Sequence, residues 1–479
     1  MTRLWIDVED IFAFALHGGR RPTGIQRLSF ELCKAIVARY GSGDAIRFLR
    51  HDRLRGTFTR IPWTEVETVF FELTQSGQRA ERPPRSLRLV AEHKLRGALR
   101  PLAGRLPQEL RAPLVRMLTS QFNALAAFAA LVRAVVRLSV RQLWRRKRRN
   151  EPVVEDSTFT RDATAGDVLL IPGAAFVHTD YPALIARTQR KFGVRVALLL
   201  YDIIPVRRPE FVDRVHAETF RAWLDGMLPL CDHLFAISRS AAAEAEDHAR
   251  RDGLVLRDRV HPIPIGSGFS TDLAAAPATA SVNLPAAGTY VLFVSTIEAR
   301  KNHGLLVRVW RRLLDELPRD QVPALVFAGH VGWMVEDLMQ QLRNTNFLDG
   351  RILLVSHPND AELAALYRGC LFTVFPSLYE GWGLPVTESL TFGKPCVISN
   401  ATSLPEAGGR LARYFDPENI AEATRVIRET IEDRAALAAW EQRIASEFSP
   451  VAWDVSAQAL IGALRSRAAP QGVAQTASV

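Results

Sequence analysis

The stretch that decides the fold is residues 371–406, LFTVFPSLYEGWGLPVTESLTFGKPCVISNATSLPE. Its first apolar run, Leu371–Phe375, is typical of a buried strand. Pro385 has the fixed φ that suits the first turn of a helix, and Gly393 suits a left-handed helix end. The stretch therefore predicts a strand, a loop, a helix from about Pro385 and a second strand that begins at Cys396.

Two carboxylates lie in this unit where a ligand is expected. The predicted loop carries Glu380, and Glu388 follows one turn into the helix. Gly381 and Gly383 leave backbone N–H groups uncovered at the helix start, which favours a bound anion or a polarised hydroxyl. In open α/β sheets, ligands bind in the crevice at the carboxyl ends of the strands. Either acid alone also fits as a helix-start acid that complements the macrodipole; together they predict a binding site.

The same alternation of short apolar runs and helical stretches extends over most of the chain. The expected strands are Leu4–Ile6, Val168–Ile171, Val196–Tyr201, His233–Ile237 and Val260–Ile265 in the first half, and Tyr290–Val294, Ala324–Ala328, Arg351–Val355, Leu371–Phe375 and Cys396–Ser399 in the second. Strands that alternate with helices predict parallel sheets covered by helices on both faces.

With 479 residues the chain is too long for one ordinary core, so two domains are expected. A charge-free segment rich in alanine and proline, residues 273–288, is the predicted linker. It separates a first domain, residues 1–272, from a second, residues 289–450, and the tail 468–479 is expected to be disordered. Four scattered cysteines and the lack of a signal-peptide pattern favour a cytoplasmic location.

One segment, about residues 79–160, interrupts the α/β pattern. Between Arg82 and Arg149 there are 17 Lys and Arg against two acids, a net charge of +15, so the rest of a chain of net charge +10 carries −5. The longest charge-free run, Met117–Val132, is too short and too polar to span a bilayer. Apolar stretches flanked by arginines are typical of helices in a membrane interface, so we expect this insert to bind an anionic membrane surface. A helical subdomain with a solvated basic face is the alternative. No nucleic-acid partner is expected, because aromatic stacking platforms are missing.

Residues 371–406 closely resemble the donor-site signature of the retaining GT-B glycosyltransferases of family four, in which seven residues separate two glutamates. Glu380 and Glu388 match the two acids. The flanking family sequence is matched by FPSLYEGWGLP, FGKPCV and SNATSLPE. The resemblance implies that Glu388 binds the ribose and that Glu380 contacts the donor sugar. The loop between them would hold sugar and phosphate through Gly381, Trp382, Gly383 and Leu384. A C-terminal helix, residues 451–467, would return to the first domain.

A second matching piece is residues 294–303, VSTIEARKNH, which follow the first strand of the second domain. Adjacent cations there, Arg300 and Lys301, would stabilise a diphosphate leaving group as its charge develops; solvated helix-start charges are the alternative. The commoner family wording has an arginine after a glycine, where this chain has Ser295 and Thr296. The variant is similar to GTIEPRKN of O-antigen mannosyltransferases, which makes GDP-mannose the expected donor and assigns Thr296 to the donor site.

In the first half, residues 197–210, ALLLYDIIPVRRPE, also resemble the family. Tyr201 stands where many members have histidine. Asp202 would then be the polar group nearest the acceptor, with a catalytic role or only the task of turning the chain after a strand.

A loop rich in Gly, Arg and Pro, residues 18–24, precedes a predicted helix in the first half, and its Thr23 and Gly24 are the expected acceptor-side residues. A connector with solvated basic residues is the alternative. No DxD or histidine cluster suggests a metal, and His178 and His303 stand alone, so no metal site is expected.

These observations predict a GT-B fold, with two facing Rossmann-like α/β domains, a cleft between them and a basic helical insert in the first domain. We expect a retaining, metal-independent hexosyltransferase, without a cofactor, that moves mannose onto a lipid-linked saccharide or surface-polysaccharide acceptor at the inner face of the cytoplasmic membrane. Leaving-group stabilisation, rather than a protein nucleophile, would supply much of the catalysis. Two alternatives remain open. The donor is another nucleotide sugar, UDP- or dTDP-linked (rhamnose, for example), or the chain is a catalytically silent membrane-docking subunit of a polysaccharide assembly complex.

Overall fold

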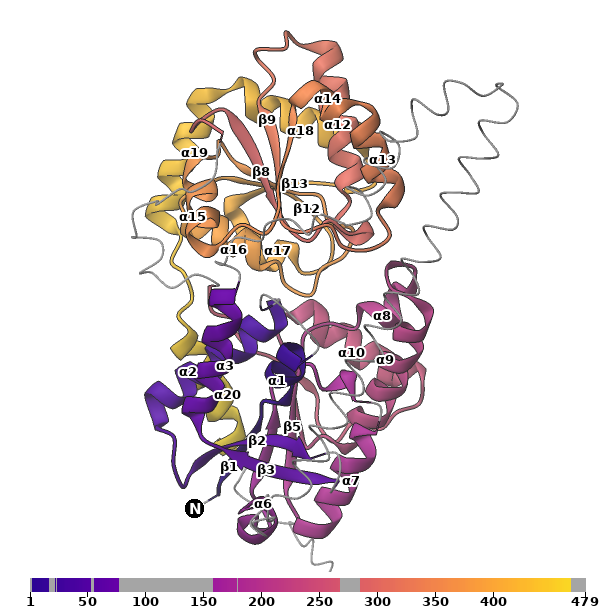
Figure 1. Cartoon of the computed structure of the whole chain (residues 1–479), viewed down its shortest axis with the longest axis vertical. Coiled ribbons are helices and arrows are strands. Elements are labelled where there is room, and N and C mark those ends of the chain that lie inside the picture. The colour runs from indigo at the N-terminus through magenta and orange to yellow at the C-terminus, as the bar shows by residue number, and fades with distance from the viewer. Residues whose placement is uncertain are drawn as a thin grey trace, which may run out of the picture. The chain divides into compact units, whose positions relative to one another are not determined.

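The computed structural model describes residues 2–16, 22, 24–52, 56–76, 158–178, 180–267 and 285–466. These residues form two sheets, each covered by its own helices (Figure 1). Thr23, nearly all of the predicted basic insert, most of the predicted linker and the C-terminal tail lie outside the described residues.

The first sheet has seven strands in the order β3-β2-β1-β4-β5-β6-β7. Their bounds are β1 Leu4–Asp7, β2 Ile46–Asp52, β3 Thr57–Ile61, β4 Val168–Ile171, β5 Arg195–Leu200, β6 His233–Ala236 and β7 Val260–Pro262. Neighbouring strands are parallel except for β2 and β3, which pair antiparallel. The sequence analysis did not predict this antiparallel edge. The connection between β2 and β3 is too short for a parallel crossover, and the charges of β2 (IRFLRHD) masked its apolar pattern.

Helices cover both faces of this sheet: α1 Glu9–Leu16, α2 Gly24–Tyr40, α3 Trp63–Ser76, α6 Thr158–Asp162, η1 Ala175–Val177, α7 Tyr181–Phe192, α8 Ile204–Arg207, η2 Pro209–Phe211, α9 Arg214–Met227, η3 Leu228–Leu230, α10 Arg239–Arg251 and, from the end of the chain, α20 Trp453–Ser466. Successive residues of a strand face opposite sides. Leu199 of β5 accordingly packs with α2 and α20, whereas Leu198 packs with α7, α9 and α10.

The second sheet has six parallel strands in the order β10-β9-β8-β11-β12-β13. Its strands are β8 Tyr290–Val294, β9 Ala324–Ala328, β10 Ile352–Val355, β11 Thr373–Phe375, β12 Cys396–Ser399 and β13 Ala412–Phe415. Its helices are η4 Ala299–Lys301, α12 His303–Glu316, α13 Glu336–Asn344, α14 Asn346–Gly350, α15 Asp360–Gly369, α16 Leu384–Thr391, α17 Leu404–Gly408, η5 Gly409–Leu411, α18 Ile420–Glu432 and α19 Arg434–Glu447. Only β13 was missed in this sheet, because its sequence, ARYF, contains an arginine and is only partly buried.

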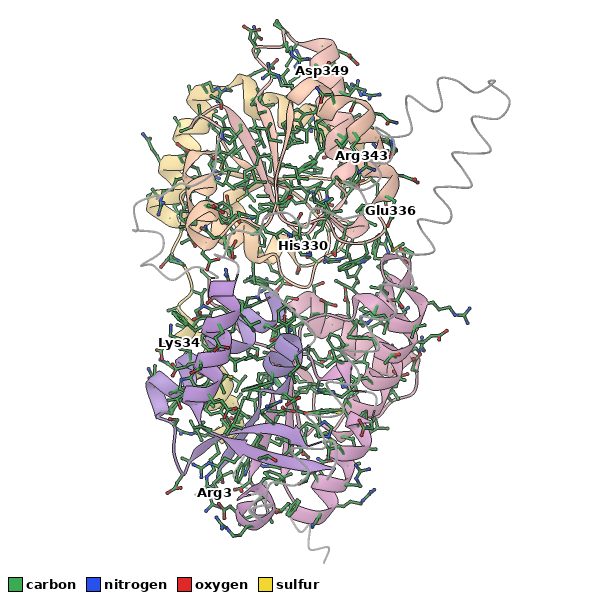
Figure 2. All side chains as sticks on the ribbon, viewed as in Figure 1. Arg3, Lys34, His330, Glu336, Arg343 and Asp349 are labelled. Carbon is green, nitrogen blue, oxygen red and sulfur yellow. The ribbon has the colours of Figure 1, made fainter. Side chains whose placement is uncertain are left out.

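Charged side chains lie on the outer faces of the helices. Lys34, Glu336 and Arg343, labelled in Figure 2, are all exposed. At the start of β1 the backbone N–H of Arg3 donates to the Asp167 carboxylate at 2.9 Å, and Trp5 Nε1 donates to the same group at 3.0 Å, which fixes β1 beside β4. Within the described ranges, every helix is too short or too polar to cross a membrane.

Candidate active site

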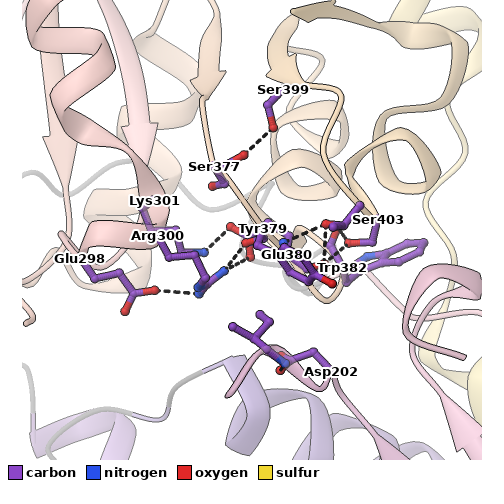
Figure 3. Close-up of polar contacts among 12 residues, drawn as sticks. Asp202, Glu298, Arg300, Lys301, Ser377, Tyr379, Glu380, Trp382, Ser399 and Ser403 are labelled. Atoms are coloured by element: carbon purple, nitrogen blue, oxygen red, sulfur yellow. Dashed lines mark hydrogen bonds and ion pairs between the residues drawn. The ribbon is translucent and has the colours of Figure 1, made fainter. Parts of the chain in front are cut away.

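Glu380 lies in the loop between β11 and α16, as the sequence predicted, and it is bound by two cations. Its carboxylate accepts hydrogen bonds from Arg300 Nη1 at 2.8 Å and from Lys301 Nζ at 2.5 Å (Figure 3). Burial alone would raise the pKa of this carboxyl, but the two cations outweigh burial and lower its pKa to about 2. Glu380 is therefore expected to be ionised at neutral pH.

Arg300 joins Glu380 to a third acid that the sequence analysis did not single out. Its Nη2 donates to Glu298 at 2.7 Å, and its Nη1 also donates to the carbonyl of Tyr379 at 2.5 Å. Glu298 is only 3% exposed. Burial disfavours the charge of Arg300, yet the two carboxylates raise its pKa above the ordinary value. Glu298 stands two residues before Arg300 in the quoted stretch TIEARKN, so its position in the sequence could have indicated it.

The chain after β12 holds the Glu380 loop in place. Thr402 Oγ1 accepts from the backbone N–H of Glu380 at 2.9 Å and donates to the carbonyl of the same residue at 2.8 Å. Ser403 Oγ donates to the carbonyls of Glu380 at 2.8 Å and Trp382 at 3.1 Å. Both hydroxyls belong to the SNATSLPE segment, so its polar residues set the conformation of the loop.

Glu388 has different surroundings from Glu380. It is 6% exposed on α16 and accepts a hydrogen bond from the hydroxyl of Tyr367 at 2.9 Å. Burial raises its pKa, and Arg27 and the Tyr367 bond oppose that rise. Arg27, at the start of α2, is itself bonded to Asp360 at 2.9 Å. The two signature acids therefore differ physically, because one is ion-paired and the other is held by a neutral hydroxyl.

The loop glycines are required by close approaches. A Cβ on Gly381 would lie 2.6 Å from the carbonyl oxygen of Tyr201 and 3.0 Å from Cβ of Asp202. Gly383 has φ of +112°, which disfavours other residues, and a Cβ there would meet Leu404 at 2.7 Å. Glycine at 381 thus lets the donor loop touch the segment that follows β5.

Asp202, the predicted acceptor-side acid, lies in that segment and faces the Glu380 network (Figure 3). Its Oδ1 accepts the backbone N–H of Ile204 at 3.0 Å, so it does turn the chain after the strand. Burial raises its pKa, while this hydrogen bond and Arg300 act in the opposite direction. The neighbouring Tyr201 donates its hydroxyl to the carbonyl of Pro172 at 2.5 Å, which is a structural bond.

The remaining predicted residues are dispersed around this centre. Gly24 begins α2, and a Cβ there would lie 3.8 Å from Leu384, the first residue of α16. Trp382 is partly buried and packs against the cores of both sheets. Thr296 follows β8, and its methyl group is what a Cβ on Gly332 would meet at 2.7 Å.

The buried His303 of α12 does not extend this site. His303 is 1% exposed with Nε2 3.2 Å from Ser295 Oγ, and burial, with Lys301, lowers its pKa to about 3. The one described cluster with metal-like spacing, Asp225, His248 and Asp252, joins α9 to the end of α10, and its acids already pair with Arg221.

Comparison with known proteins finds a family match around this site. Residues 278–446, which include Arg300, Lys301, Glu380 and Glu388, match the family model described as Glycosyl transferases group 1. Over this segment the chain is similar to the group 1 glycosyltransferases. Its GT-B fold, as predicted, is shared with HepE of Anabaena in complex with UDP and glucose, with a TM-score of 0.55, 15% identity, and coverage of 97% of this chain and 100% of that one.

Several curated relatives are named mannosyltransferases. O-antigen chain mannosyltransferase B of Escherichia coli is 35% identical over 144 residues, 30% of this chain and 37% of that protein. Serotype-specific mannosyltransferase WbdA of Escherichia coli is 27% identical over 287 residues, 57% of this chain and 34% of that protein. D-inositol 3-phosphate glycosyltransferase of Thermobifida fusca is 27% identical over 303 residues, 58% of this chain and 65% of that protein. The matches span little more than a third of the length of the Escherichia coli proteins.

Proposed function

We propose that this chain transfers mannose from GDP-mannose, with retention of configuration, to a hydroxyl of a lipid-linked saccharide. Its family supports glycosyl transfer, and its mannosyltransferase relatives support the sugar. The observation that carries the proposal is the ionised Glu380 between Arg300 and Lys301, at the same sheet edge as the buried Glu388.

The two cations are suited to different tasks. The side chain of Lys301 makes one hydrogen bond in the described structure, to Glu380, whereas the side chain of Arg300 makes three. A lysine ammonium on a flexible stem moves at small cost, and a bidentate arginine between two acids does not. We assign to Lys301 the contact with the departing diphosphate, and to Arg300 the fixing of Glu380 toward the donor sugar. Glu388 would accept the ribose hydroxyls.

The step needs no cofactor in this proposal. The bond between the anomeric carbon and the diphosphate oxygen breaks, the acceptor oxygen bonds to the anomeric carbon, and the acceptor's hydroxyl proton passes to the departing diphosphate oxygen. Both oxygens of Glu380 are engaged by cations, which makes this carboxylate a weak nucleophile. The barrier is lowered chiefly by stabilising charge on the leaving diphosphate, through Lys301 and the N–H groups at the start of α16.

A thermal-shift panel of GDP-mannose with UDP-, dTDP- and ADP-sugars tests the donor. A ligand present at 100 times its dissociation constant stabilises the folded state by about 2.7 kcal/mol. We expect the largest shift with GDP-mannose, and an α-linked product by NMR after transfer. A larger shift with a UDP- or dTDP-sugar contradicts the assignment of mannose. Donor binding without hydrolysis or transfer would instead support a silent docking subunit.

We also propose that the basic insert anchors the enzyme to anionic membranes. This part of the proposal stands on sequence alone, since residues 77–157 lie outside the described structure. Each basic residue near an anionic surface contributes about 1 kcal/mol, and salt screens this attraction. In flotation assays we expect binding to anionic vesicles that weakens as salt rises. Charge reversal at Arg145, Arg146, Arg148 and Arg149 should release the protein, while equal binding to neutral vesicles contradicts the proposal.

A further inference from the structure

A cavity of about 230 Å³ opens beside Asp202, next to the donor loop. Its wall comes mainly from segments that follow β4 and β5 and from α9, with Glu298, Arg300 and Trp333 from the second sheet's loops. Pockets that hold a drug-sized molecule measure roughly 300–1,000 Å³. The cavity, which we call the aromatic pocket, therefore matches a ligand of about one ring.

One wall of the aromatic pocket is a rigid group of aromatic rings. The ring centroids of Phe176 and Phe220 are 5.2 Å apart, those of Phe220 and Trp223 5.5 Å, and those of Phe176 and Trp223 5.7 Å. His216 packs edge-on against Phe176 at 5.8 Å. Rings packed in this way hold one another in place, so the wall is preformed for a flat ligand surface.

The polar residues of the aromatic pocket select against charged and purely apolar ligands. Asp202 and Glu298 contribute carboxylates, and the guanidinium of Arg300 is already bonded to Glu298 and Glu380. Carboxylates repel a phosphate, and an alkyl chain would bury them without hydrogen bonds, at a cost in free energy. The ligand must therefore be neutral, with hydroxyl donors along its edge and C–H groups on its face. A pyranose ring has this pattern.

We propose that the aromatic pocket binds one neutral pyranose, the terminal sugar of the acceptor. The proposal rests on the glycosyl transfer proposed above. Arg300 lines the pocket and also donates to Glu380, so a sugar bound there lies one side chain away from the donor acids. Asp202 and Glu298 would accept its hydroxyls and thereby choose which of them faces the donor.

Trp333 offers the sharpest test of this assignment. It lines the aromatic pocket, is 48% exposed, and donates its Nε1–H to the carbonyl of Phe211 at 3.0 Å. Its neighbour Met334 is 50% exposed and does not line the pocket. Trp333→Ala and Met334→Ala therefore remove similarly exposed apolar side chains from the same loop, and only the first should affect the acceptor.

The experiment measures binding of methyl α-D-mannopyranoside to the full chain by saturation-transfer NMR, with saturation of the aromatic protons. An aromatic contact contributes on the order of 0.5–1.5 kcal/mol, so we expect Trp333→Ala to raise the dissociation constant about 3- to 10-fold. Met334→Ala should change it less than twofold. Val212→Phe, which adds a ring to the lining, should abolish sugar binding while GDP binding stays as in the wild type.

Other outcomes overturn the inference. Equal effects of Trp333→Ala and Met334→Ala, sugar binding that survives Val212→Phe, or displacement of the sugar by inorganic phosphate or by a long-chain alcohol would exclude a pyranose subsite here. Donor binding and donor hydrolysis are measured in parallel on the same variants. If these persist while the methyl mannoside fails to bind the wild type, only the pocket assignment fails. If the wild type neither binds nor hydrolyses any nucleotide sugar, the proposed function fails as well.

Discussion

Buried acids follow strands of both sheets, yet in the described structure no cation is bonded to Asp7 or Asp10 of the first sheet, whereas two are bonded to Glu380 of the second. At the first edge, burial raises the pKa of Asp7 to about 6 and that of Asp10 to about 7. At the second edge the pKa of Glu380 falls to about 2 although Glu380 is also buried. Buried acids that follow strands of the two sheets therefore differ in their ionisation.

The partners of each acid explain the contrast. Asp7 accepts from the hydroxyl of Tyr181 and from the backbone N–H of Glu9 at 2.9 Å, whereas the nearby cation, Arg50, is bonded to Glu9 at 2.9 Å. Neither carboxylate oxygen of Asp10 has a hydrogen-bond partner among the described residues. Burial favours the neutral acid unless a cation bonds to it; Arg50 is bonded to Glu9 and not to Asp7, whereas Arg300 and Lys301 are bonded to Glu380. Strand-end position makes an acid available to a ligand, and neighbouring charge decides its ionisation.

Removing the cations should have the largest effect. Arg300→Met leaves Glu298 buried without its ion pair, so we expect the free energy of unfolding to fall by about 3 kcal/mol or more. Lys301→Met leaves Glu380 paired with Arg300, so stability should fall much less, while kcat/KM falls about 10²-fold or more. Urea denaturation and steady-state kinetics separate the two roles. Equal stability of both variants would contradict the division of tasks, as would loss of nucleoside binding in Lys301→Met.

Substitutions of Glu388 and Glu380 are expected to affect different steps, nucleotide binding and turnover. Glu388→Gln should weaken binding of the bare nucleotide about 10-fold or more, because it removes charge-assisted hydrogen bonds to ribose. Glu380→Gln should lower kcat about 10²-fold and leave nucleotide affinity nearly unchanged, since Glu380 is assigned to the sugar and the transition state. Calorimetry with GDP makes the distinction. Tyr367→Phe, which removes only a neutral partner of Glu388, is the matched control and should have a smaller effect on affinity.

Asp10→Asn should change how the stability of the protein depends on pH. The folded-state pKa of Asp10 lies above its unfolded value, so the folded protein holds a proton that the unfolded chain has released, and stability falls as pH rises toward 7. Between pH 5.5 and pH 8 this loss is about 2 kcal/mol, and the Asn variant should not suffer it. Denaturant titrations at both pH values measure the difference. A variant that shows the same pH dependence as the wild type would mean that Asp10 is ionised in the fold.

The second edge should respond to pH in the opposite direction. His303 has a folded-state pKa of about 3, below its unfolded value, so acidification protonates the unfolded chain first and stability falls as pH drops below about 6.5. At pH 5.5 this costs about 1 kcal/mol, which His303→Gln should abolish. Denaturant titrations of the wild type and His303→Gln at pH 5.5 and pH 7 measure this loss of stability. No change in the acid limb of the stability profile would show that His303 becomes protonated in the folded state.

Much of the fold was predicted from local pattern. The strands at Tyr290–Val294 and Ala324–Ala328 have in the structure the bounds expected from their apolar runs, and Gly393 has the left-handed φ of +70° expected at the end of α16. These features follow from short-range sterics and from burial on both faces of a sheet. Both leave a local pattern of apolar residues and glycines in the sequence. The sequence analysis did not predict strands β2 and β3. Their pairing with each other stabilises them as strands, and their composition does not indicate it.

The sequence by itself singled out Glu380, Glu388, Arg300 and Lys301 as the proposed site residues, because their stretches resemble the family wording and follow strands of the second sheet. Only the tertiary structure decided their states. It gave both cations to Glu380, added Glu298 to the network, and left Glu388 to the hydroxyl of Tyr367. A pKa depends on burial and on charges within a few ångströms. Those neighbours come from segments far apart in the chain, so no local pattern records them.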